Sequence, residues 1–293
     1  MSAQLFRDLD EIREMLARVR RMGATIGLVP TMGALHEGHG SLIEAARRET
    51  DCVVVSIFVN PIQFDREEDL NRYPRHLDAD MQFCHDRGVD LVFAPSAEDM
   101  YPSPPRAFVE VTHVSDELCG RFRPGHFRGV ATVVLKLFNI LQPDRAFFGE
   151  KDAQQLSVIR RMARDLNLPV KIAPVATVRE ADGLALSSRN KHLDAEQRMI
   201  APILFQALLV AQKLIAAGAA NPAEVKAAAL AVLGQQPLAR VEYLEVVDVD
   251  DMQPVGQIDG PVRVAAAVWV GPTRLIDNML CEPGSTPGSG LIQ

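Results

Sequence analysis

Apolar residues in the first 180 positions alternate between short continuous runs and longer stretches with helical spacing. Five Val- and Ile-rich runs are short enough for buried strands, at 24–29, 52–59, 89–94, 144–148 and 170–175. Between them, apolar positions recur every three or four residues, which predicts helices at 4–22, 40–49, 76–87, 129–141 and 152–166. Short buried strands that alternate with helices predict an α/β fold with a Rossmann-like parallel sheet and helices on both faces.

The pattern changes after about residue 178. An Ala- and Leu-rich helix is predicted at 195–217, and a second helix follows the Asn-Pro break and runs to about 233. Alternating segments at 241–247 and 262–270 then predict strands, so two helices are followed by two or three strands. We expect a Rossmann-like domain over 1–178, a small α+β domain over 179–283 and a disordered tail over 284–293.

The composition is that of a globular protein of roughly two domains: 293 residues, 47% hydrophobic and 24% charged, with net charge −7. This acidic balance disfavours nucleic acid and anionic membranes as partners, although it leaves a nucleotide possible. No apolar run approaches the roughly 20 residues that span a bilayer, and the N-terminus lacks a signal-peptide core. Four cysteines without metal spacing (Cys52, Cys84, Cys119, Cys281) indicate a reducing compartment. We expect a cytoplasmic protein with Cys52 in its core.

The first predicted strand runs into a His-Gly turn, with the sequence TMGALHEGHG over residues 31–40. A helix that begins near Gly40 presents unpaired backbone N–H groups and a dipole that favours an anion. His36 and His39 are three residues apart, so both imidazoles point to the same side. These features indicate a phosphate site. The alternative is a Gly-rich loop with two surface histidines, and the flanking strand and helix favour the functional interpretation.

A second strand-to-helix junction carries the sequence FFGEKDAQQ. Lys151 is a point positive charge for phosphate, and Glu150 and Asp152 orient it or hold Mg²⁺ through water. Gln154 and Gln155 provide donors and acceptors for a small polar substrate. The alternative is a capping sequence with a solvated charge cluster.

Two further segments carry polar groups suited to binding. Ser187, Ser188 and Arg189 combine two hydroxyls with a guanidinium, a phosphate clamp on a mobile loop, although such a loop by itself is not specific. Asn60 and Gln63 follow the second predicted strand, on the ligand side of a parallel sheet.

A fifth segment, RFRPGHFRG over residues 121–129, places three arginines and His126 around a Pro-Gly turn. It is suited equally to attracting anions and to forming an interface loop, and the sequence leaves both possibilities open.

Together these segments closely resemble the pantoate–β-alanine ligase family. A single HxGH motif would indicate only the wider nucleotidylyltransferase group, whereas the full set is specific. The matching blocks follow the family's order and cover essentially residues 1–280: VPTMGALHEGH (29–39), VNPIQF (59–64), RPGHFRGV (123–130), FGEKD (148–152) with QQ (154–155), and LSSRN (186–190).

The resemblance implies an ATP-dependent condensation of (R)-pantoate with β-alanine to pantothenate. Pantoate would attack the α-phosphorus of ATP to give a bound pantoyl adenylate and pyrophosphate, and β-alanine would then displace AMP. Mg²⁺ would enter with ATP. The resemblance also implies a homodimer whose smaller C-terminal domain closes over the site as a lid. The sequence itself shows no recognisable nucleophile motif, which agrees with a reaction without a covalent enzyme intermediate.

The resemblance also implies roles for individual residues. His39 is the proton donor or charge stabiliser, and Gln63 binds both pantoate and β-alanine. Gln155 binds pantoate, with Asn60 as a lesser contact. The other catalytic residues implied are His36, Lys151, Ser187, Ser188 and Arg189. The implied ATP-binding set is Met32, Gly33, Ala34, Leu35, His36, Glu37, Gly38, His39, Gly149, Glu150, Lys151, Asp152, Val178, Leu186, Ser187, Ser188 and Arg189.

The chain departs from the family pattern at two positions. Ala153 stands where an aromatic residue is usual, and Leu186 where methionine is common, a swap that conserves volume.

Other functions remain open: another nucleotidylyltransferase, a fragment of a class I tRNA synthetase, which the acidic balance disfavours, or a non-catalytic ATP sensor.

Overall fold

The structure, a computed structural model, describes residues 3–65 and 67–284. Contacts within the chain divide it into two compact units. The segments 113–122 and 151–157 join residues from 177 onward in the second unit, a grouping that the sequence did not predict. The first unit consists of the remaining segments, Met1–Thr112, Arg123–Glu150 and Val158–Ala176. Most of the tail predicted as disordered, from 285 onward, lies outside the described residues.

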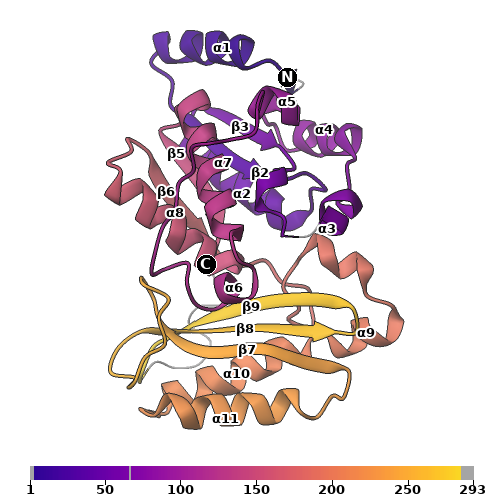
Figure 1. The fold of residues 1–293 in the computed structure, drawn as a ribbon, viewed down its shortest axis with the longest axis vertical. Helices are drawn as coiled ribbons and strands as arrows, with labels where there is room; N and C mark the ends of the chain where they lie inside the picture. Colours follow the sequence, from indigo (N-terminus) through magenta and orange to yellow (C-terminus); the bar gives the residue numbers. More distant parts are fainter. Residues whose placement is uncertain (1–2, 66, 285–293) are drawn as a thin grey trace. The chain divides into compact units, whose positions relative to one another are not determined.

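The first unit contains a six-stranded sheet in the order β1-β4-β3-β2-β5-β6, with every neighbouring pair parallel. Strands β2, β3, β5 and β6 of this sheet are labelled in Figure 1. Strands β3 and β4 lie on one side of β2 in the sheet, and β5 and β6 lie on the other side. The strand order therefore reverses between β2 and β5. Ligands bind parallel sheets at such a switch point. The strands are β1 (Gln4–Phe6), β2 (Ile26–Thr31), β3 (Cys52–Ile57), β4 (Leu91–Phe93), β5 (Arg145–Gly149) and β6 (Lys171–Val175).

Helices connect these strands and bury the sheet. The burial confirms the predicted parallel sheet, because β2 and β3 are buried along almost their whole length. Ile43 and Ala46 of α2 pack against Val29 and Val55 in one apolar cluster. The helices and 3-10 turns up to residue 165 are α1 (Leu9–Arg21), α2 (Glu37–Glu49), η1 (Pro61–Gln63), α3 (Glu67–Arg72), α4 (Leu77–Asp86), α5 (Ala97–Met100), α6 (Cys119–Phe122), α7 (His126–Leu141), η2 (Glu150–Asp152) and α8 (Ala153–Asp165).

The helix predicted at 4–22 is wrong at its start. Residues 4–6 form the edge strand β1, in which Leu5 pairs with Val92 of β4. The helix begins only after Asp8, whose carboxylate accepts hydrogen bonds from the N–H groups of Asp10 (2.8 Å) and Glu11 (3.0 Å). The N-cap sets this boundary because its side chain satisfies N–H groups that have no partner within the helix.

Two further helices begin three residues earlier than predicted. α2 begins at Glu37 rather than Gly40, and α7 begins at His126 rather than Gly129. His36 caps α2 with its imidazole, and Gly125 precedes α7 with φ 80°. Both predictions placed a helix start at a glycine that lies inside the helix.

The second unit contains a three-stranded antiparallel sheet in the order β7-β8-β9. Helices α10 and α11 pack together and cover one face of this sheet (Figure 1). The small α+β fold is as predicted, and β9 is the third strand that was left open. The elements are η3 (Ser188–His192), α9 (Ala195–Ile200), α10 (Ile203–Ala216), α11 (Pro222–Leu233), β7 (Ala239–Asp248), β8 (Val262–Val270) and β9 (Thr273–Cys281).

The segment Ala195–Ala216 is long and apolar enough to cross a membrane by length and composition alone, a test that a core helix also meets. The predicted single helix over this segment is two helices, α9 and α10, separated at Ala201 and Pro202. Leu204, Leu208 and other apolar residues of α10 lie in the core of the second unit. The segment thus provides core packing for this unit.

All four cysteines are buried and free, in agreement with the expectation of no disulfide framework. Cys52 lies in the core as predicted. Burial raises the pKa of the Cys52 thiol to about 11 and that of Cys84 to about 12, so these thiols are protonated at neutral pH.

Candidate active site

The His-Gly turn follows the carboxyl end of β2, the strand at the switch point. Gly33 (φ 84°) and Ala34 (φ 52°) both adopt the left-handed backbone region. A Cβ on Gly33 would lie 2.8 Å from Oδ2 of Asp80, so the position requires glycine. The turn therefore has a backbone conformation, with two successive positive φ angles, that few sequences permit.

Asp80, on α4, holds this turn in place. Its carboxylate accepts hydrogen bonds from the N–H of Ala34 (3.0 Å) and the N–H of Leu35 (2.8 Å), and only 4% of the residue is exposed. A buried carboxylate that accepts two backbone N–H groups makes strong charge-assisted hydrogen bonds. The sequence analysis missed Asp80, because Asp80 is 46 residues from Ala34 and looks like one of several acidic residues on its helix.

The two histidines cap α2 as well as facing one another. Nδ1 of His36 accepts from the N–H of Gly38 (3.1 Å), and Nδ1 of His39 accepts from the N–H of His36 (3.3 Å). The ring centroids are 4.2 Å apart, as their spacing predicts. The imidazoles thus engage two backbone N–H groups at the start of α2. An imidazole whose Nδ1 accepts a hydrogen bond carries its proton on Nε2.

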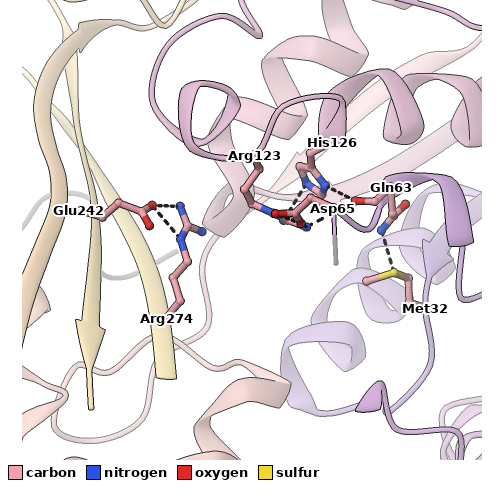
Figure 2. Close-up of polar contacts among 7 residues, drawn as sticks. All are labelled: Met32, Gln63, Asp65, Arg123, His126, Glu242 and Arg274. Carbon is pink, nitrogen blue, oxygen red and sulfur yellow. Dashed lines mark hydrogen bonds and ion pairs between the residues drawn. The ribbon is translucent and has the colours of Figure 1, made fainter. Parts of the chain in front are cut away.

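Gln63, in η1, lies beside the turn (Figure 2). Its Nε2 donates to Sδ of Met32 at 2.8 Å, and Nδ1 of His126 lies 2.9 Å from its backbone carbonyl. Arg123 contacts Asp65 at 3.3 Å in the same group. Burial raises the pKa of Asp65, but its own backbone hydrogen bond and Arg123 more than offset this, so the net shift is downward.

The structure places residues 123–129 of the fifth segment against η1. A Cβ on Gly129 would collide with the backbone oxygen of Ile62, so only glycine permits this close approach. Within the first unit, this segment supports the backbone around Gln63.

A separate pocket lies in the second unit. Lys151, Ser187 and Arg189 line it together with residues from α10 and β9. The side chain of Lys151 is 17% exposed, and its Nζ lies 3.8 Å from Oδ1 of Asp152. Ser187 and Arg189, two of the three residues of the predicted phosphate clamp, thus share a pocket with Lys151 and Arg274.

Ion pairs hold the base of the Ser-Ser-Arg loop. Arg179 contacts the buried carboxylate of Asp277 through two hydrogen bonds, at 2.6 and 3.0 Å. Arg198 bridges Glu180 and Asp182, each at 2.6 Å. In the same unit Glu242 and Arg274 form another pair, also drawn in Figure 2.

The predicted site residues fall into two groups, one in each unit. Within each unit the structure brings the group's main members together, the turn with Gln63 and Lys151 with the Ser-Ser-Arg loop. The first group comprises Met32 to His39, Asn60, Gln63, Gly149 and Glu150, and the second comprises Lys151, Asp152, Gln155, Val178 and Leu186 to Arg189.

The neighbouring glutamines on α8 differ in exposure and partners. The carboxamide of Gln154 is buried, accepts from the N–H of Cys119 (3.0 Å) and donates to the carbonyls of Val114 and Glu117. Gln154 is therefore engaged in holding segment 113–122, and Gln155 is partly exposed. Ala153, the departure from the family pattern, is buried at the first position of α8.

The parallel sheet and the HxGH turn after its switch-point strand define the class of Rossmann-like α/β enzymes with a ligand site at the carboxyl ends of the strands. Comparison with known proteins identifies the family within this class.

The family model for pantoate-beta-alanine ligase matches residues 4–280. Pantothenate synthetase from Moorella thermoacetica is 52% identical over 279 residues, covering 95% of this chain and 99% of the relative. Pantothenate synthetase from Sinorhizobium medicae is 53% identical over 276 residues, covering 94% and 95%. The chain belongs to the pantoate–β-alanine ligase family, and it is an enzyme of the ligase class.

Solved structures agree with this membership. The crystal structure of pantothenate synthetase from Thermus thermophilus has a TM-score of 0.89 and 45% identity, covering 94% of this chain and 98% of that one. A pantoate-beta-alanine ligase from Francisella tularensis, crystallised with beta-gamma ATP and beta-alanine, has a TM-score of 0.80 and 34% identity, covering 98% and 100%.

Proposed function

We propose that this chain condenses (R)-pantoate with β-alanine to form pantothenate, consuming ATP through a bound pantoyl adenylate and releasing AMP and pyrophosphate. The observation that carries the proposal is the HxGH turn, held at the switch point by Asp80, in a chain of this family. A carboxylate is a poor acylating agent, and adenylation supplies it with a good leaving group. The Francisella relative, crystallised with an ATP compound and β-alanine, supports the same substrate set.

In the first step, a carboxylate oxygen of pantoate attacks the α-phosphorus and pyrophosphate leaves. Negative charge increases on the phosphate oxygens, and phosphoryl transfer is catalysed mainly by positioning and charge stabilisation. Because Nδ1 of both His36 and His39 accepts backbone N–H groups, the protons on Nε2 are the ones these rings can direct to phosphate. We assign His39 an electrostatic role first and proton donation second.

Other residues hold the substrates. Gln63 binds pantoate and then β-alanine, and Gln155 binds pantoate. Lys151 and Arg189, which line one pocket with Ser187, neutralise phosphate charge. In the second step, the amine of β-alanine attacks the acyl carbon, AMP leaves, and the amine proton passes to solvent or phosphate. A closed site protects the adenylate from water.

Mg²⁺ belongs to this proposal as a partner of ATP. In residues 3–65 and 67–284 no group of three or more His, Cys, Asp or Glu side chains is arranged to hold a metal ion. Phosphate oxygens would therefore provide most of its ligands, with Glu150 or Asp152 contributing through water. The ion would neutralise charge on the leaving pyrophosphate.

We also infer a homodimer, from the family resemblance, and a cytoplasmic location, from four cysteines that are all free. Sedimentation velocity of the purified protein measures the oligomeric state directly.

Isotope exchange tests the proposed reaction. Labelled pyrophosphate should enter ATP in the presence of pantoate and without β-alanine. A non-catalytic ATP sensor would show no exchange, and another nucleotidylyltransferase would exchange without pantoate or equally with other acids. Either result would overturn the proposal.

A further inference from the structure

Asn60 is buried beneath Gln63, with 1% of its surface exposed. Its Nδ2 donates to the backbone carbonyl of Gly129 (3.1 Å) and to Oε1 of Gln63 (3.1 Å). Its Oδ1 accepts from the hydroxyl of Tyr101 (2.9 Å). Every polar atom of this carboxamide is therefore engaged with protein, and the side chain is too enclosed to contact a ligand directly.

The backbone carbonyl of Gly129 sets the direction of these hydrogen bonds. A carbonyl can only accept, so it fixes the NH₂ end of Asn60 toward itself. The same NH₂ group then requires an acceptor from Gln63, which must present Oε1. Nε2 of Gln63 consequently points the other way, where it lies 2.8 Å from Sδ of Met32, a residue of the His-Gly turn.

Tyr101 donates its hydroxyl proton to the oxygen end of the Asn60 carboxamide, opposite the NH₂ end. Its ring lies 6.2 Å from the ring of Phe58, and Nζ of Lys136 lies 5.2 Å from the Tyr101 centroid. Burial raises the pKa of Tyr101 to about 12, so the hydroxyl keeps its proton at neutral pH and donates it to Asn60. Without that donor, Oδ1 of Asn60 would be a buried acceptor with no partner, and such a group is costly.

We propose that Tyr101 and Asn60 are positioning residues that hold the carboxamide of Gln63 with its NH₂ on the side of the His-Gly turn. Pantoate would bind on that side, so that this part of the site accepts only a group bearing acceptor oxygens. This inference rests on the proposed function, in which Gln63 binds pantoate, whose carboxylate and hydroxyl oxygens are such acceptors. A freely rotating carboxamide would present oxygen as readily as NH₂, and the fixed one gives the site its selectivity.

Tyr101→Phe tests the proposal because it removes one hydroxyl and keeps the ring contacts. Loss of the donor to Asn60 should raise the KM for pantoate by about tenfold in pyrophosphate exchange, with the KM for ATP unchanged. The matched control is Thr132→Val. Thr132 is also buried in the first unit, where its hydroxyl donates to the carbonyl of Arg128 and accepts from the N–H of Val109. This control should leave both KM values unchanged.

Asn60→Asp provides a second variant of nearly the same shape. A carboxylate has no N–H for the carbonyl of Gly129 or for Oε1 of Gln63, so Gln63 would turn its NH₂ toward position 60. The KM for pantoate should then rise by well over tenfold, more than in Tyr101→Phe.

A double-mutant cycle separates positioning from general stability. In a Gln63→Ala background, Tyr101→Phe should no longer change the KM for pantoate, since there is no carboxamide left to orient. A purely structural role for Tyr101 would impair both backgrounds equally, and that result would overturn the proposal. An unchanged KM for pantoate in Tyr101→Phe would also overturn it.

The proposed function and this inference fail in different ways. If the unaltered protein shows no pantoate-dependent exchange, the proposed function is wrong. If the unaltered protein exchanges normally and Tyr101→Phe and Asn60→Asp match it, only the positioning role is wrong.

Discussion

The two loops that we expect to contact phosphate are stabilised in opposite ways. The His-Gly turn in the first unit rests on a buried carboxylate and on imidazoles that cap its own helix. The Ser-Ser-Arg loop in the second unit rests on ion pairs at its base, while Arg189 is exposed. Within the described part of the chain, Oδ1 of Asn190 in this loop is buried without a hydrogen-bond partner.

This difference suggests that the turn and the loop contribute to different steps of the reaction. The turn already has its geometry before any ligand binds, which is what stabilisation of a transition state requires. The loop has an exposed tip and a less satisfied interior, features of segments that open locally. We therefore expect changes in the turn to lower the rate of adenylation and changes around the loop to lower affinity for ATP.

The largest effect should follow from removing an imidazole of the turn. His39→Ala should lower single-turnover adenylation by about 100-fold or more, the range found for loss of one charge-stabilising donor. The control is His85→Ala on α4, an exposed histidine in the same unit. A near-normal rate in His39→Ala would contradict the role of the turn.

Asp80→Asn should have the second-largest effect on the rate. It replaces a carboxylate that accepts two N–H groups with an amide that accepts through one oxygen. A misplaced turn should lower kcat by roughly 10–100-fold, with a smaller change in the KM for ATP. Asp78→Asn, a substitution at a more exposed aspartate on the same helix, is the control. If Asp80→Asn changed only the melting temperature and not kcat, the turn would not depend on this support.

Lys151→Ala should act mainly on binding. Loss of one charge-assisted contact to phosphate should weaken ATP affinity by about tenfold and slow adenylation, as measured by calorimetry and exchange. Lys213→Ala on α10 removes an exposed lysine of the second unit as the control. Unchanged ATP affinity together with an unchanged adenylation rate would show that Lys151 does not contribute to the ATP site.

The smallest effect should come from the base of the loop. The hydrogen bond from Arg198 lowers the pKa of Asp182 below its ordinary 3.8. Because the folded-state pKa is lowered, this pair stabilises the protein above pH 3.8 and loses its effect as pH falls through the folded value. Asp182→Asn should cost less than about 1 kcal/mol of unfolding free energy at pH 7, since the pair is partly exposed.

Denaturant unfolding at several pH values checks this expectation. The difference between Asp182→Asn and the unaltered protein should shrink as pH falls below 3.8 and as salt is added at pH 7. A difference that stayed constant with pH would contradict a contribution of the ionised Asp182 carboxylate to stability.

The sequence predicted most of the fold because the evidence for each element is local. The apolar run at 52–59 predicts a strand from its own residues, and β3 occupies most of that run. The prediction was wrong at residues 4–6, which form a strand through pairing with β4, a partner outside the segment. It was also wrong at 195–217, where a local signal, Pro202, divides an otherwise uniform apolar pattern.

In the candidate site, too, the sequence did not indicate residues whose partners are distant along the chain. The sequence indicated the turn, Gln63, Lys151 and the Ser-Ser-Arg loop, because each carries polar side chains at the end of a predicted strand or in a loop. It did not indicate Asp80 or Tyr101, whose partners are 46 and 41 residues away. It also left the segment 121–129 between two interpretations, and the structure shows that residues 123–129 support η1.

By itself, then, the sequence determined where strands and helices alternate and which loops carry chemistry, because hydrophobic period and turn residues act over about ten positions. The tertiary structure alone decided how those loops are held. A hydrogen bond requires donor and acceptor within about 3 Å with the right direction, and only folding brings Gly129 to Asn60 across 69 residues of chain. The orientation of the Gln63 carboxamide is a property of that packing, not of any segment of the sequence.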